Sequence, residues 1–241
     1  MSFISELFGH LMKWIYMNFM SLGPEPARVS YLAMTLMVMA LVSKIITIPL
    51  TWKSTQVSEK MQKFQPELDK IKEKYSYDER ILQQKIQEYY KEHNMTMAGC
   101  SGCLPMIIQF VLIIALFYVI QKPGKYMFED PSAIDRIQKN FLWIPDLTKA
   151  DPKAWFGMPL LNMFTQLGVT FLNPQMKQQE QAGMSTSFMK YMPIMFYVIT
   201  IKWSAGLLLY WAVGNLFEII FRGISTLIVK LKKKEGVPEK D

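Results

Sequence analysis

The sequence predicts an all-α polytopic membrane protein in which five transmembrane helices surround a hydrophilic groove. Of its 241 residues, 51% are hydrophobic, and these residues gather in long blocks instead of spreading evenly. The charged stretch between the first two blocks, residues 54–101, keeps the mean hydropathy of the whole chain at only +0.11. Long apolar blocks cross a bilayer as helices, because a helix satisfies its own backbone hydrogen bonds in lipid. This distribution excludes a disordered chain and a uniform soluble domain.

Residues 1–28 are expected to form an amphipathic helix that lies in the membrane interface outside the cytoplasm. An apolar stripe follows helical spacing through Ile4, Leu7, Phe8, Leu11 and Ile15. Glu6, His10 and Lys13 share the opposite face. A cleavable signal peptide is the alternative. Glu6 and the lack of a basic N-terminal region argue against it.

The rest of the chain divides into five expected spans and their connections. The expected boundaries are 29–53 for the first span, 54–101 for a cytoplasmic helical hairpin, 102–121 for the second span, 122–154 for an extracytoplasmic loop, 155–175 for the third span, 176–187 for a cytoplasmic loop, 188–202 for the fourth span, 203–230 for the fifth span and 231–241 for a basic cytoplasmic tail.

The segment 54–101 has the pattern of a two-helix hairpin. Its apolar residues step alternately by four and three positions, through Val57, Met61, Phe64, Leu68, Ile71 and Tyr75. A turn at residues 75–78 precedes a second helical stripe that ends near His93. A solvated charged spacer is the alternative. If the hairpin forms, its seam either holds the two helices together or offers Met61 and Phe64 to a partner.

Lysine and arginine residues set the expected orientation, because they favour cytoplasmic loops. The 27 such residues outnumber Asp and Glu and give a net charge of +7. Of these, 16 fall in the expected cytoplasmic segments, which are residues 53–103, the loop after the third span with Lys190, and the C-terminal tail, and nine fall on the other side. The N-terminus is therefore expected outside and the C-terminus inside. The tail cluster consists of Lys230, Lys232, Lys233 and Lys234.

Lys44 is the first candidate for a functional residue, because it lies inside the first expected span. A charge at that depth costs from about 2.5 to well over 10 kcal/mol, so the side chain should face water or a partner. Thr47 and Thr51 follow it at helical spacing and extend a polar stripe. Snorkelling of the lysine to the inner interface is the alternative.

The fifth span carries a second polar stripe, and the third span carries a weaker one. The stripe of the fifth span is Trp211, Asn215, Glu218 and Arg222, of which the last two can pair at i, i+4. Asn162, Gln166, Asn173 and Gln175 belong to the third span or its inner end. Polar faces on three helices predict a shared hydrated groove. Hydrogen bonds that only hold the helices together are the alternative.

Enzyme chemistry is not predicted. The two cysteines, Cys100 and Cys103, form one CxxC without a second pair, and the two histidines have no metal-ligand spacing. No phosphate-binding or nucleophile motif occurs. We therefore expect no catalytic residue, no metal and no cofactor.

Five segments in this order resemble the YidC membrane protein insertase family. They are Lys44–Thr51, the charged hairpin, Gly102–Gln109, Met192–Phe196 and Ser204–Leu216. The resemblance implies five core helices around a groove that opens to the cytoplasm and to lipid. It also implies a positive groove residue at Lys44, where the family normally has arginine, a polar groove residue at Gln175 and an aromatic one at Trp211.

The function implied by the resemblance is insertion and folding of newly made membrane proteins, alone or with the Sec translocon. The implied partners are nascent membrane-protein clients, the ribosome, signal-recognition targeting machinery and the phospholipid bilayer, but not DNA. The implied location is the bacterial plasma membrane. A proton- or solute-coupled transporter that uses Lys44, Glu218 and Arg222 as a relay is the alternative, although the chain shows no internal repeat.

Overall fold

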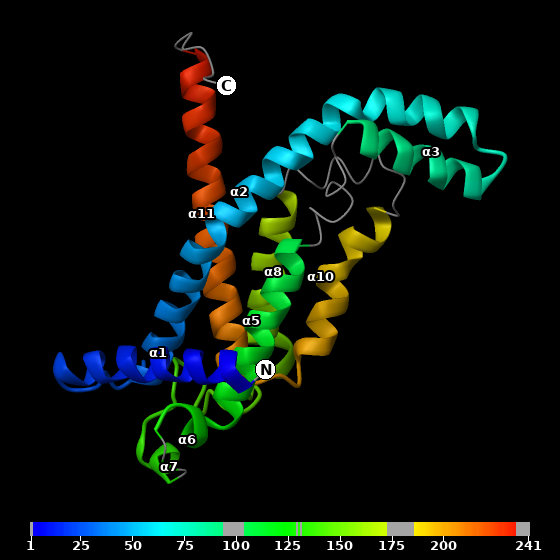
Figure 1. The fold of residues 1–241 in the computed structure, drawn as a ribbon. Coiled ribbons are helices and arrows are strands. Elements are labelled where there is room, and N and C mark those ends of the chain that lie inside the picture. Colours follow the sequence, from blue (N-terminus) through cyan, green and yellow to red (C-terminus); the bar gives the residue numbers. More distant parts are fainter. Residues whose placement is uncertain (1, 94–103, 129, 131, 173–185, 235–241) are drawn as a thin grey trace. The chain divides into compact units, whose positions relative to one another are not determined.

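The computed structural model is built from helices and describes residues 2–93, 104–128, 130, 132–172 and 186–234 (Figure 1). The α-helices are α1 (Ser2–Ser21), α2 (Tyr31–Lys74), α3 (Glu79–Glu92), α5 (Leu104–Gln121), α6 (Pro123–Tyr126), α7 (Ala133–Arg136), α8 (Met158–Phe171), α10 (Thr186–Thr200) and α11 (Ala205–Lys234). A short 3-10 helix, η1 (Ala154–Phe156), precedes α8. Within these described ranges, β-pairing is limited to isolated bridges. The all-α class is therefore confirmed.

The chain forms two compact units. The first contains residues 1–45, 112–172 and 190–241, and the second contains residues 46–111 and 173–189. The boundary falls inside α2, which continues without a break from the first expected span into the first helix of the hairpin. Lys44 consequently belongs to the first unit, whereas Thr47 and Thr51 belong to the second.

Two helical segments of the described chain are long and apolar enough to cross a bilayer. They are Tyr31–Pro49 in α2 and Ala205–Ile224 in α11, and Ile108–Gln121 in α5 is apolar but shorter. The described helices α8 and α10 have 14 and 15 residues, fewer than the roughly 17–25 that a span needs. Two of the expected spans are thus supported by length and composition, and the count of five stays a prediction.

The core of the first unit lies where α2 and α11 begin. Near the start of α11, Leu207 and Leu208 are almost fully buried, and Leu36 of α2 and Leu116 of α5 join them. Gly206 permits this packing, because a Cβ there would come within 3.0 Å of Leu36. This end of the unit is therefore filled by buried apolar side chains. The polar site described below lies farther along both helices.

Helix α1 buries most of the apolar stripe that the sequence predicts. Ile15 of the stripe lies in the core with Met12 and Tyr16, and Phe8 and Leu11 pack against the core. Leu7 is the exception, because it is 57% exposed. Gly9 also lies on the buried face, where an added Cβ would overlap the backbone of Tyr126 in α6. The close backbone approach at Gly9 sets the rotation of α1, which packs against α6 and runs across the direction of α11 (Figure 1).

A hydrogen-bonded loop, residues 139–157, covers the first turns of α2 and α11. Its backbone accepts hydrogen bonds from the N–H groups of Ala205 (2.7 Å) and Gly206 (2.8 Å). Asp151, which is only 3% exposed, accepts hydrogen bonds from the backbone N–H of Met158 (2.6 Å) and from the indole of Trp143 (3.1 Å). The contact with Met158 begins α8 at that residue, later than the expected start of the third span at residue 155.

In the second unit, the end of α2 and α3 form a helical hairpin (Figure 1). Asp78 caps α3 by accepting hydrogen bonds from the N–H groups of Arg80 and Ile81. Phe64 of α2 packs against Tyr89 and His93 of α3, with ring centroids 6.2 and 4.9 Å apart. Burial raises the pKa of Tyr89 to about 12, and the hydrogen bond from its hydroxyl to Glu67 acts in the same direction. Phe64 therefore contributes to the seam of the hairpin.

Candidate functional site: a charged polar cluster between α2, α8 and α11

Lys44, Glu218 and Arg222 form a three-residue ionic cluster, the triad, within the first unit. The ammonium group of Lys44 lies 2.7 Å from Oε2 of Glu218. Arg222 donates two hydrogen bonds to the other carboxylate oxygen, from Nε at 3.0 Å and from Nη2 at 2.8 Å. Each carboxylate oxygen of Glu218 therefore has its own cation.

The triad is largely shielded from the exterior. The side chains of Lys44, Glu218 and Arg222 are 18%, 20% and 16% exposed. Ion pairs in such surroundings are screened less than surface pairs, and breaking one leaves a costly unpaired charge. Two cations and one anion give the triad a formal charge of +1, which attracts a negatively charged group.

Local sequence explains how α11 holds its part of the triad. Glu218 and Arg222 stand one helical turn apart, so their side chains meet on one face. Gly214 lies one turn before Glu218, and a Cβ there would come within 3.0 Å of Cε of Lys44. The missing side chain at Gly214 leaves the space through which the lysine stem reaches the carboxylate.

An uncharged polar network continues along the same face of α11. Trp211 donates from Nε1 to Oε1 of Gln166 in α8 (3.1 Å). Asn215, which is 2% exposed, donates to the same oxygen (3.1 Å) and to Oγ1 of Thr165 (3.3 Å). These bonds join α8 to α11, which also pack against each other.

A small cavity adjoins this network. Its lining consists of Asn162, Met163, Gln166, Pro193, Phe196, Tyr197, Thr200 and Trp211. Asn162 is 5% exposed, and its Oδ1 is one of two buried side-chain oxygens in the described residues that lack a hydrogen-bond partner. Such an acceptor suits a water molecule or another donor. The polar face of α8 is therefore partly satisfied by α11 and partly turned toward the cavity.

Comparison with known proteins decides the family. The family model of the 60Kd inner membrane protein matches residues 27–233, which is most of the chain. The chain belongs to this family. Its members are inner membrane proteins by that description, which supports a membrane location.

Relatives in several bacteria carry the same name, membrane protein insertase YidC. The chain is 33% identical to the protein of Fusobacterium nucleatum over 77% of its own length and 82% of that relative. It is 31% identical to the protein of Clostridium perfringens over 86% of its length and 82% of that relative. A protein of Neisseria gonorrhoeae is 34% identical over 76% of the chain, which spans only 31% of that longer relative. The resemblance drawn from the five motifs is confirmed.

The structure brings together five of the residues that the sequence analysis places in a groove. Lys44, Glu218 and Arg222 form the triad, while Trp211 and Asn215 belong to the neighbouring network. Thr47 and Thr51 fall in the second unit, and Gln175 lies outside the described residues. For all eight residues, membership of a groove stays a prediction.

Thr165 is a site residue that the sequence did not single out, and Gln166 was predicted only as part of the polar face of the third span. Gln166 accepts hydrogen bonds from Trp211 and Asn215, and Thr165 accepts one from Asn215. The sequence places Gln166 on the polar face of the third span, which was the available signal. Which polar residue of α8 meets α11 depends on helix packing, so spacing within one helix does not determine it.

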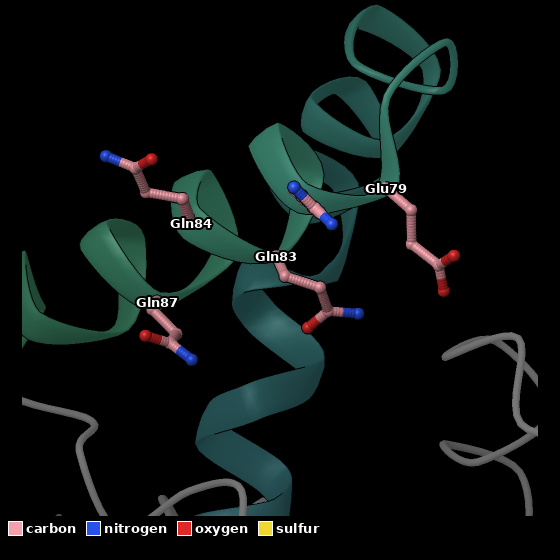
Figure 2. Close-up of a pocket in the computed structure, with 5 residues that line it drawn as sticks. Glu79, Gln83, Gln84 and Gln87 are labelled. Atoms are coloured by element: carbon pink, nitrogen blue, oxygen red, sulfur yellow. The ribbon is translucent and has the colours of Figure 1, made fainter.

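The residues expected to recruit partners are described only in part. Phe64 packs inside the hairpin, as stated above, whereas for Met61, Lys230, Lys232, Lys233 and Lys234 the structure describes the helical backbone. A shallow surface on α3 is lined by Glu79, Arg80, Gln83, Gln84 and Gln87. Figure 2 shows the glutamate and the glutamines projecting from the helix as separate side chains. This surface is polar and offers no convergent group of ligands.

Metal binding finds no support in the described ranges, where no group of three or more His, Cys, Asp or Glu side chains is placed to hold an ion. The CxxC at Cys100 and Cys103 lies outside those ranges. Among the described residues, the chemistry available at the site is therefore ion pairing and hydrogen bonding.

Proposed function

We propose that this protein is a membrane protein insertase that also helps its clients to fold. The observation that carries the proposal is the triad, a shielded cluster with one excess positive charge on helices of the length and apolarity of membrane spans. The names of the relatives, membrane protein insertase YidC, support the same activity. Insertion breaks no covalent bond, which fits a family of insertases and not of enzymes.

In the proposed mechanism, the site lowers the free-energy barrier to moving the polar tail of a client across the membrane. A client helix with a short acidic tail gains about 0.3 to 0.6 kcal/mol for each Leu, Ile, Phe or Val that reaches the bilayer centre. The tail, however, must cross the apolar layer, where an ionised group is costly. The positive triad and the polar groups of Gln166 and Asn215 provide a hydrated route for the tail, while the apolar segment moves into lipid. Partition of the client supplies the free energy, and no cofactor is consumed.

The mechanism implies two groups of partners, those that insertion itself requires and those that would deliver clients. Client helices and the lipid bilayer are required by insertion itself. The ribosome, the signal-recognition targeting machinery and the Sec translocon are further proposed partners, for which the hairpin and the cluster Lys230, Lys232, Lys233 and Lys234 provide charged cytoplasmic surfaces. DNA is not among the proposed partners.

The proposed orientation places the N-terminus outside the plasma membrane and the C-terminus in the cytoplasm. Single cysteines in a Cys100→Ser, Cys103→Ser background test it in intact cells. A membrane-impermeant maleimide should label Lys153→Cys in the loop 139–157 and should leave Arg80→Cys on α3 unlabelled until the membrane is opened. The reverse pattern would overturn the orientation.

Reconstitution tests the function. Liposomes that carry the protein should protect a single-span client with an acidic tail from added protease, and empty liposomes should protect much less. Equal protection in both preparations would refute the insertase proposal. Flux of protons or a small solute through the same liposomes would instead favour the transporter alternative.

A further inference from the structure

The bonding of Glu218 raises a question about the proposed function, on which this inference rests. An acidic client group needs a cation, yet the ammonium group of Lys44 already lies 2.7 Å from Glu218. A client carboxylate and the carboxylate of Glu218 are chemically alike, so both suit the same position beside Lys44. A client can therefore pair with Lys44 only if Glu218 moves away or shares it.

The triad has the geometry that such an exchange requires. Lys44 contacts Oε2, whereas the two hydrogen bonds from Arg222 go to Oε1. Loss of the contact with Lys44 leaves both bonds to Arg222 in place, so the glutamate stays paired when it gives up the lysine. A buried carboxylate that lost its sole cation would oppose the exchange strongly.

The lysine side of the pair is also suited to exchange. Its ammonium group is a compact charge on a flexible four-carbon stem, and the stem passes the open position at Gly214. The three side chains keep 16–20% of their surface exposed. A small anionic group can therefore approach without unpacking the core, which lies nearer the start of α11.

We propose that Glu218 is a resident counter-ion of Lys44 that an acidic group of the client displaces, and that Arg222 retains Glu218 during the exchange. Glu218 then acts as a specificity-determining residue. Only a tail with a carboxylate can replace Glu218 beside Lys44, whereas a tail without one leaves this ion pair in place and inserts without the exchange. The substrate class is a membrane segment with at least one acidic residue in the translocated tail.

The proposal predicts opposite effects for two neighbouring substitutions. Glu218→Gln removes the competing charge but keeps an oxygen that accepts from Arg222, so the initial insertion rate of an acidic-tailed client should rise several-fold. Arg222→Gln removes the bonds that hold Glu218 during exchange, so the same rate should fall about tenfold, as expected when a charged group loses its hydrogen bonds. In the double variant Glu218→Gln, Arg222→Gln the rate should return above that of Arg222→Gln.

The experiment compares these variants in proteoliposomes with two clients that differ only in one tail residue, Asp or Asn. The rate for the Asn client should change little in every variant. Glu88→Gln provides a matched control, because Glu88 pairs with Lys85 at 2.6 Å in the hairpin with 42% exposure. Its rates should equal those of the wild type.

The outcomes separate this inference from the proposed function. If the wild type inserts neither client above empty liposomes, the insertase proposal fails. If the wild type inserts both clients but Glu218→Gln and Arg222→Gln shift the Asp client in the same direction, the triad only holds α2 and α11 together and the exchange is refuted. Opposite shifts that are confined to the Asp client are the expected result.

Discussion

Lys44 lies inside an apolar block of α2, and its ammonium group is 2.7 Å from the carboxylate of Glu218 in α11. Its depth in an apolar block was enough to predict a partner or water around the charge. The pairing of Glu218 with Arg222 also follows from their spacing on one helix. The contact between Lys44 and Glu218 joins positions 174 residues apart, and helical periodicity contains no information about such a contact.

Gly214 has a role that spacing could not indicate, and it provides a residue-level prediction. Gly214→Leu should displace the stem of Lys44, because even a Cβ would lie 3.0 Å from Cε. Insertion of an acidic-tailed client should fall, while Gly214→Ala should have a smaller effect, since a flexible stem can shift by a few tenths of an ångström.

Gly223 on the same helix is the matched control for this change. A Cβ at Gly223 would meet nothing within 4 Å, so Gly223→Leu should leave the insertion rate near that of the wild type. Equal loss in Gly214→Leu and Gly223→Leu would show that a leucine in α11 is harmful in itself and that the lysine path is irrelevant.

Among the elements, the helices were easier to predict than the loop 139–157. Apolar blocks and the seam of the hairpin indicate helices because their periodicity is local. The loop depends on hydrogen bonds to residues far away in sequence, such as those from the N–H groups of Ala205 and Gly206. The apolar stripe of α1 is buried for the most part as predicted, whereas the close approach of Gly9 to Tyr126 is a tertiary contact that the sequence did not indicate.

Asp151 organises this loop, and its removal should destabilise the first unit. Asp151→Ala leaves the N–H groups of Trp143 and Met158 without their acceptor and should lower the unfolding free energy by about 2–4 kcal/mol. Thermal unfolding in detergent measures the change. Asp130→Ala is the control, since Asp130 is half exposed beside Ser132 and Arg136, and it should cost less than about 1 kcal/mol. Similar losses for both variants would contradict the role of Asp151.

The hairpin offers a second prediction about an element. Replacement of residues 57–92 by a short Gly-Ser linker should leave insertion of a purified client into liposomes nearly unchanged, because the triad lies in the first unit. Insertion from translating ribosomes should fall several-fold. Unchanged insertion from translating ribosomes would refute the proposed role of the hairpin in recruiting them. Tyr77→Ser, at a turn residue that is 75% exposed, should leave both activities intact.

For the whole molecule, the order of motifs identified the family, whereas the ionic triad and its polar neighbours could be located only in the tertiary structure. The first unit combines a closed apolar core at the start of α2 and α11 with a triad of charge +1 farther along both helices. That arrangement suits a protein that admits a charged tail partway into the bilayer without opening a continuous pore.

The decisive measurement is insertion of three clients, which differ only in an acidic, neutral or basic tail, by wild type, Lys44→Arg and Lys44→Glu in liposomes. Wild type and Lys44→Arg should insert the acidic client faster than the basic one. Lys44→Glu turns the charge of the triad from +1 to −1, so it should lose the acidic client by about tenfold or more and favour the basic client instead. If all three proteins rank the clients in the same order, the charge at position 44 does not select the tail and the proposed mechanism is wrong.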